Sequence, residues 1–208
     1  MAIETKILAC KLFINRDKSM YKKISIIFFS ILLTLPCYAE KNSPQVTLTT
    51  NMGVILLELY PENSPVTVKN FLTYVERKYY DGLIFHRVIN RFMIQTGGFN
   101  EDLTRMNPTE KSIKNESSNG LKNKKFTIAM ARTQDPDSAK AQFFINVADN
   151  GSLDAQSDKP GYAVFGKVIG GMDIVEKISR LPTQRASGMA DVPTATVKII
   201  KTRIITDR

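Results

Sequence analysis

Cysteine, histidine and tryptophan are scarce in this chain of 208 residues, which has two Cys, one His and no Trp. Both cysteines, Cys10 and Cys37, lie upstream of the predicted cleavage site described below. The remaining chain would therefore have no disulfide and no chemistry based on a thiol. One histidine without cysteine also leaves no obvious hydrolytic triad or zinc site. We therefore expect neither a metal nor a cofactor.

Long apolar runs are also lacking. Residues 24–35 form a run of 12 residues that is apolar apart from Ser25, Ser30 and Thr34, whereas a helix that crosses a bilayer needs about 20. Two lysines precede this run, and the small residues Cys37 and Ala39 follow it. This layout is typical of a secretory signal peptide, with its start at Met20 and cleavage after Ala39. An uncleaved anchor, a buried helix and a lipoprotein site at Cys37 are the alternatives.

Cleavage after Ala39 would leave residues 40–208 as one domain, large enough to bury a proper core. Residues 1–19 precede the predicted start and would be either an over-long gene start or an unusual extension. After cleavage we expect no stable membrane association. No linker and no internal repeat divides this part of the sequence.

Positive charge is spread along the chain rather than concentrated. The formal net charge is +9, and residues 1–39 hold six Lys or Arg and two Asp or Glu. Their removal leaves 23 basic and 18 acidic residues, and hence a net charge of +5. The densest basic patch, residues 122–125, adjoins a turn at Asn119-Gly120 and is typical of a solvated loop. A nucleic-acid interface would need interleaved aromatic residues or a basic stripe, so we expect no nucleic-acid partner.

Short strands outnumber helices in the expected fold. The predicted strands are residues 45–50, 54–60, 126–130, 142–147, 163–168 and 196–204. Ser64 as N-cap, Pro65 at the first helical position and apolar residues at helical spacing predict a helix that ends near Lys78. A second helix is expected at 173–179, and a long surface loop at 97–123. Many short strands with two helices indicate a β-barrel or a sandwich.

Residues 85–98 read F-H-R-V-I-N-R-F-M-I-Q-T-G-G and carry the clearest functional signal. Alternation along a strand would place Phe85, Arg87 and Ile89 on one face, and Met93 with Gln95 on one face. A cation, an amide and large apolar groups could then line a pocket for a small apolar ring.

Two neighbours of these residues are expected to face the other way. His86 alternates with Arg87, so we expect a hydrogen-bonded structural histidine rather than a general base. Phe143 alternates with Phe144 in the same manner, so we expect Phe143 in the core.

The 85–98 stretch closely resembles the F-H-R-V-I-x-x-F-M-x-Q-x-G-[GD] signature of the cyclophilins, which are peptidyl-prolyl cis/trans isomerases. Further segments resemble the family in the same order. They are I-A-M-A-R-T at 128–133, S-A-K-A-Q-F-F-I-N at 138–146, S-L-D at 152–154, Y-A-V-F-G-K-V at 162–168 and G-M-D-I-V at 171–175. The resemblance covers residues 45–204. It implies a mainly β fold, a closed eight-stranded antiparallel barrel capped by two helices.

The resemblance also implies roles for individual residues. Arg87 matches the catalytic arginine, and Gln95 matches the glutamine that steadies it. Phe92, Met93, Phe144 and Leu153 match the apolar floor and walls of the proline pocket. Ala131 and Arg132 occupy the edge segment that pairs with the substrate chain, Gln142 matches the glutamine near the substrate carbonyl, and Tyr162 stands where many eukaryotic members have histidine.

Two departures from the eukaryotic pattern shape the expectations. Ser152 stands where members that bind cyclosporin tightly carry tryptophan, so we expect weak cyclosporin binding at most. Tyr162 and the loops at 99–118 and 156–161 resemble bacterial members. Together with the signal peptide, they predict a periplasmic protein, with secretion as the alternative. We expect a monomer.

The sequence therefore predicts an isomerase that acts on X–Pro bonds of unfolded or proline-containing polypeptides and assists the folding of exported proteins. Two alternatives use the same fold. One is a non-catalytic module that binds proline peptides, and the other is a holdase chaperone. The presence of both Arg87 and Gln95 favours the enzyme, because a binding module could keep the pocket without the donor.

Overall fold

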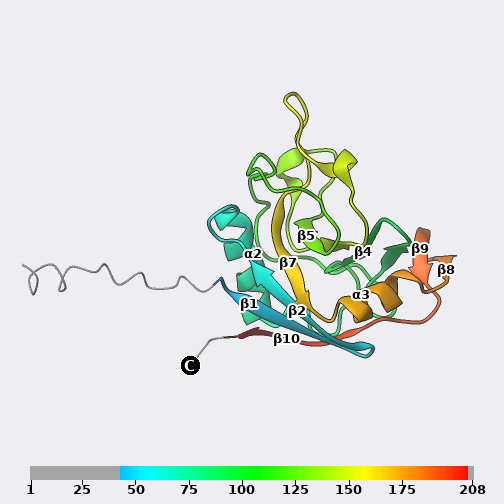
Figure 1. Cartoon of the computed structure of the whole chain (residues 1–208). Helices are drawn as coiled ribbons and strands as arrows, with labels where there is room; N and C mark the ends of the chain where they lie inside the picture. The colour runs from blue at the N-terminus through cyan, green and yellow to red at the C-terminus, as the bar shows by residue number, and fades with distance from the viewer. Residues whose placement is uncertain (1–42, 206–208) are drawn as a thin grey trace, which may run out of the picture. The chain divides into compact units, whose positions relative to one another are not determined.

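The computed structural model describes residues 43–205, whose strands form one eight-stranded antiparallel sheet and one hairpin (Figure 1). The order in the large sheet is β10-β1-β2-β7-β5-β6-β4-β3. Its strands are β1 (Gln45–Thr50), β2 (Gly53–Leu59), β3 (Arg87–Ile89), β4 (Met93–Thr96), β5 (Thr127–Met130), β6 (Phe143–Asn146), β7 (Val164–Gly170) and β10 (Ile199–Ile205). The predicted start at Met20 and cleavage after Ala39 lie outside the described residues.

The sheet is open and curled, so the expectation of a closed barrel is wrong. Its edge strands β3 and β10 do not pair with each other. The segments before them approach instead: Ile84 and Lys198 form an isolated bridge, and the Phe85 N–H donates to the Val197 carbonyl at 2.9 Å. Because β3 has only three residues, it ends the sheet before a continuous ladder to β10 can form.

The two faces of the inner strands have different neighbours. Val88, Ile94, Ile145 and Ile128 are buried in the main core on one face. The same core holds the rings of Phe71, Tyr80, Phe143 and Phe165, which confirms the prediction for Phe143. Residues directly opposite one another across antiparallel strands share a face. The alternate residues of β3, β4, β6 and β5 therefore form a separate surface, described in the next subsection.

Phe85 corrects one prediction about these faces. It is buried in the main core with Val88, so it does not share the face of Arg87 and Ile89. The strand β3 begins at Arg87, and Phe85 lies in the extended segment that bonds to Val197. Strict alternation does not continue from that segment into β3, and the sequence pattern alone could not show the break.

Two helices accompany the sheet, as predicted. They are α2 (Pro65–Glu76) and α3 (Met172–Ser179). Ser64 is the N-cap of α2, but its hydroxyl donates to the Val164 carbonyl at 2.8 Å rather than capping the helix. Among residues 43–205, no helix has the length and hydrophobicity needed to cross a membrane.

A hairpin near the C-terminus was not predicted. It pairs β8 (Thr183–Ala186) with β9 (Met189–Pro193) and turns at Ser187 and Gly188, which both have positive φ. Three of the four β8 residues are exposed, so the segment lacks the alternating apolar pattern that marks a strand. Contacts of β9 with β3 place the hairpin beside Arg87.

Candidate active site

One row of side chains crosses the sheet at the predicted site. Arg87 on β3 is the partner of Gln95 on β4, and Gln95 is the partner of Phe144 on β6. Phe144 is the partner of Ala129 on β5, which in turn faces Val164 on β7. Directly opposed residues point to the same face. The row therefore begins with a cation, continues with an amide and ends on apolar side chains.

A small apolar cluster, separate from the main core, surrounds the apolar end of this row. Its buried members are Met93, Ala129, Phe144 and Val164. Phe92, Ala131, Leu153 and Tyr162 are among the partly buried residues that pack against them. The rings of Phe144 and Tyr162 meet edge to face, with centroids 5.6 Å apart. The structure thus brings six of the predicted substrate-binding residues into one cluster. They are Phe92, Met93, Ala131, Phe144, Leu153 and Tyr162.

Arg87 and Gln95 lie side by side on paired strands but bond to different partners. The Arg87 side chain is 44% exposed, and its Nε lies 3.6 Å from Oδ2 of Asp191. Gln95 donates from Nε2 to Oε1 of Gln142 at 2.9 Å. Within residues 43–205, no side-chain hydrogen bond joins Arg87 to Gln95, although the two residues are paired in the sheet. The two predicted glutamines therefore form one polar unit next to the arginine.

The edge segment at 131–132 contacts Gln142 on one side and the loop at Pro160 with Tyr162 on the other. The Ala131 N–H donates to the Gln142 carbonyl at 2.9 Å. The Arg132 guanidinium donates to the Pro160 carbonyl at 2.8 Å and lies 4.6 Å from the centre of the Tyr162 ring. Its charge is thus directed to a loop and an aromatic face, and it helps to hold Tyr162 against the cluster.

Buried asparagines support the site from below, and the sequence prediction missed them. Asn150 donates from Nδ2 to the Phe92 carbonyl and to Oδ1 of Asn146, both at 2.7 Å. Asn146 is fully buried and donates to the Thr127 hydroxyl at 2.9 Å. Buried amides are stable when bonded in this way. The sequence signal that could have found Asn146 is a lone amide at the end of the apolar run Phe143–Asn146.

His86 is buried against Phe99 and is not a member of the row. It is 4% exposed, and its ring centre lies 4.6 Å from that of Phe99. Burial lowers the pKa of His86 from 6.5 to about 4, so the ring is neutral at pH 7. The ring forms a hydrogen bond with the backbone of Ile84, whereas Nδ1 has no partner among the described residues. A buried ring with this environment is unsuited to act as a general base at the site.

One cavity borders the row, and another borders the apolar cluster. One of about 560 Å³ is lined by Gln95, Ala131 and Gln142 among others, and one of about 600 Å³ by Leu153 and Tyr162 among others. Their size suits segments of an extended peptide on either side of a ring held by the cluster.

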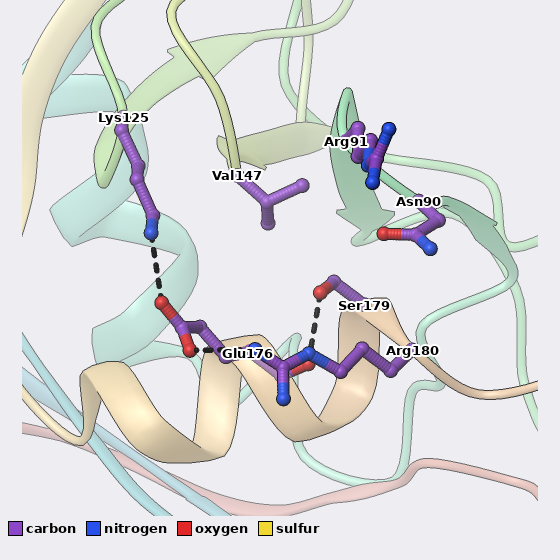
Figure 2. A pocket seen from close by; sticks show the side chains of 7 residues that line it. All are labelled: Asn90, Arg91, Lys125, Val147, Glu176, Ser179 and Arg180. Atoms are coloured by element: carbon purple, nitrogen blue, oxygen red, sulfur yellow. Dashed lines mark hydrogen bonds and ion pairs between the residues drawn. The ribbon is translucent and has the colours of Figure 1, made fainter.

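A third cavity has no residue of the site in its lining. Figure 2 shows this cavity of about 320 Å³ beside α3, where Lys125 and Arg180 both point to Glu176. Their nitrogens lie 2.8 and 3.1 Å from the Glu176 oxygens, so this carboxylate compensates both cations. In the described part of the chain, no three His, Cys, Asp or Glu side chains are grouped as metal ligands would be.

Comparison with known proteins decides the family. The model of the cyclophilin type peptidyl-prolyl cis-trans isomerases matches residues 45–204. The chain belongs to this family. It is 48% identical over 185 residues to the peptidyl-prolyl cis-trans isomerase of Acinetobacter baylyi, an alignment that covers 89% of this chain and 96% of that protein. It is 50% identical over 151 residues to isomerase B of Escherichia coli, covering 71% and 92%.

A solved cyclophilin shares the fold. The crystal structure of a Cryptosporidium parvum cyclophilin type isomerase in the presence of the dipeptide Ala-Pro has a TM-score of 0.66 and 25% identity. The match covers 78% of this chain and 99% of that chain. The chain is therefore a cyclophilin that catalyses the cis/trans isomerisation of peptidyl-prolyl bonds.

Proposed function

We propose that Arg87 is the catalytic donor of this cyclophilin and that the apolar cluster holds the proline ring. The rotation barrier of an amide is about 18–20 kcal/mol, because the nitrogen lone pair is delocalised into the carbonyl. In a twisted amide the lone pair is localised on the prolyl nitrogen. A guanidinium aimed at that nitrogen stabilises the twisted form more than the planar form, and this difference accelerates rotation.

The row across β3, β4 and β6 is the observation that carries this proposal. It sets a half-exposed guanidinium next to the amide pair of Gln95 and Gln142 and then the ring of Phe144. Arginine suits the task because it stays charged and has a fixed fork of donors. Phe92, Met93, Leu153 and Tyr162 would enclose the proline ring, and the solved relative with Ala-Pro supports a proline ligand on this fold.

The other polar residues would position the substrate chain. Gln142 would bond to a substrate carbonyl while Gln95 holds it from behind. The backbone at Ala131 and Arg132 would lie alongside the substrate, between the two bordering cavities. The ring would stay fixed while the rest of the substrate rotates.

The test is cis-to-trans exchange of an Ala-Pro peptide, measured by NMR exchange with the wild type and with Arg87→Ala. We expect the variant to lose about 10²- to 10³-fold in kcat, the range found when one preorganised donor is removed. Arg87→Lys is the matched control, because it keeps the charge but loses the fork, and it should lie between the two. Full activity of a folded Arg87→Ala protein would refute the role of Arg87.

We further propose that the enzyme acts on unfolded proteins in the periplasm. The signal-like layout before Ala39 supports export, and the relatives in Acinetobacter, Dickeya and Escherichia support a bacterial setting. Cell fractionation, with the mass of the exported chain, tests this. A chain that starts at Met1 and stays in the cytoplasm would contradict it.

A further inference from the structure

Asp191 lies next to the proposed catalytic arginine, although it is far from it in sequence. Its Oδ2 atom is 3.6 Å from Nε of Arg87, and the two side chains are 39% and 44% exposed. Within residues 43–205, Asp191 is the acidic residue that forms an ion pair with Arg87. Asp191 lies in none of the motif segments that resemble the family, and it comes from the unpredicted β8–β9 hairpin.

A β-bulge aims Asp191 at β3. Gln184 pairs with Val192 and Ala186 pairs with Met189, so Ala190 and Asp191 together lie opposite one residue of β8. Asp191 has a φ of 61°, in the left-handed region that few residues other than glycine adopt. Bulges of this kind redirect a side chain and often lie next to active sites.

The hairpin is anchored at its base, next to the bulge. Val192 is 5% exposed, and Thr194 donates from its N–H to the Pro182 carbonyl at 2.9 Å. The carboxylate is therefore presented by a fixed backbone rather than by a free loop. A fixed carboxylate can hold a flexible arginine in one orientation.

The contact engages the Nε edge of the guanidinium. Among the described residues the two terminal nitrogens, Nη1 and Nη2, have no hydrogen-bond partner, so they remain available as donors. We propose that Asp191 is a positioning residue, which holds Arg87 from its Nε side so that a terminal nitrogen reaches the prolyl nitrogen. The inference rests on the proposed role of Arg87.

The effect should be modest and should appear in kcat. Exposed ion pairs are weak, so the loss of this one should lower kcat by about two- to fivefold. The donor acts on the twisted amide rather than on the bound ground state, so KM should change little. Salt weakens exposed ion pairs, so the wild-type kcat should fall at about 1 M salt toward that of a protein without the carboxylate.

The experiment uses Asp191→Asn and Asp191→Gly in the full-length protein, assayed by NMR exchange of an Ala-Pro peptide. Asparagine and glycine both tolerate a positive φ, so the bulge is retained while the charge is removed. Asp173→Asn is the matched control, because it removes an exposed carboxylate that pairs with Lys177 on α3. We expect both Asp191 variants to lower kcat with unchanged KM, to lose most of the salt dependence and to shift the Arg87 Nε–H NMR signal, whereas the control does none of these.

The double variant Arg87→Ala/Asp191→Asn separates this inference from the proposed function. We expect it to be no slower than Arg87→Ala, because the carboxylate acts through the arginine. If Arg87→Ala is slow but Asp191→Asn keeps the wild-type kcat, exceeds it or changes only KM, Asp191 is not a positioning residue. If Arg87→Ala keeps full activity, the role of Arg87 itself is refuted, and with it the inference.

Discussion

The two glycines that end the Arg87 motif meet different neighbours. A Cβ on Gly98 would lie 2.5 Å from Cδ and Nε2 of Gln142. A Cβ on Gly97 would lie 2.8 Å from the Ala141 carbonyl oxygen, and Gly97 has a φ of 86°. One glycine therefore leaves room for a movable side chain of the site, and the other makes a backbone turn possible.

We predict that Gly98→Ala lowers activity with little loss of stability. The new methyl group would push Gln142 away and break its 2.9 Å bond with Gln95. One hydrogen bond is worth about 0.5–1.5 kcal/mol, so kcat/KM should fall by about two- to tenfold. Peptide exchange by NMR and urea unfolding measure the two quantities.

Gly97→Ala is the matched variant at the neighbouring position. Its methyl group meets backbone atoms at a positive φ, so the free energy of unfolding should fall by more than about 1 kcal/mol. Wild-type activity of Gly98→Ala, or equal stability of both variants, would show that Gly98 does not make room for Gln142.

At the scale of elements, the N-terminus of α2 is capped from a distant loop. Glu116 accepts hydrogen bonds from the N–H groups of Val66 and Thr67, at 3.1 and 2.8 Å, and from the Thr67 hydroxyl at 2.6 Å. Ser64, the residue that the sequence marks as the cap, bonds elsewhere. The carboxylate also meets the positive end of the helix dipole. The long loop at 97–123 is therefore a structural support for α2.

We predict that Glu116→Ala lowers the free energy of unfolding by about 1–2 kcal/mol, the usual effect of removing an N-cap. Glu116→Gln should cost less, because it keeps an acceptor and loses only the charge. Urea unfolding measures both.

Glu101→Gln serves as the control for the loss of a carboxylate. Glu101 pairs with Lys198 and is 58% exposed, so its replacement should change the stability by less than about 0.5 kcal/mol. If Glu116→Ala were as stable as this control, the loop would not stabilise α2.

At the scale of the whole molecule, the single histidine couples folding to pH. Burial lowers the pKa of His86 from 6.5 to about 4. As the pH falls below 6.5, the unfolded chain binds this proton first. The stabilising contribution of neutral His86 is thus complete above pH 6.5 and is lost as the pH falls through 4, in total about 3 kcal/mol.

We predict that the wild type loses about 2 kcal/mol between pH 7 and pH 5 that His86→Phe does not lose. The phenyl ring can pack on Phe99 as the imidazole does, and it removes the unpartnered Nδ1. Urea unfolding at the two pH values measures the difference.

The NMR signal of His86 provides an independent check, because no other histidine is present in the chain. It should titrate near pH 4 in the folded protein. Titration near 6.5 would show that the ring is solvated and would remove the physical basis of the pH prediction.

The sequence by itself determined the family, the two helices, most strands and six residues of the apolar cluster. These follow from local signals: ordered motifs, helical spacing at α2, and the alternation that separates Phe143 from Phe144. Short-range patterns suffice here because each residue's face depends only on its own strand or helix.

Only the tertiary structure decided the features that join distant segments. They are the open edge between β3 and β10, the position of Phe85 in the core, the cap from Glu116 and the carboxylate of Asp191 beside Arg87. The hairpin that carries Asp191 has an exposed, irregular pattern, so no periodicity marks it. Such contacts depend on how strands and loops meet in space, and no pattern within a single element encodes that meeting.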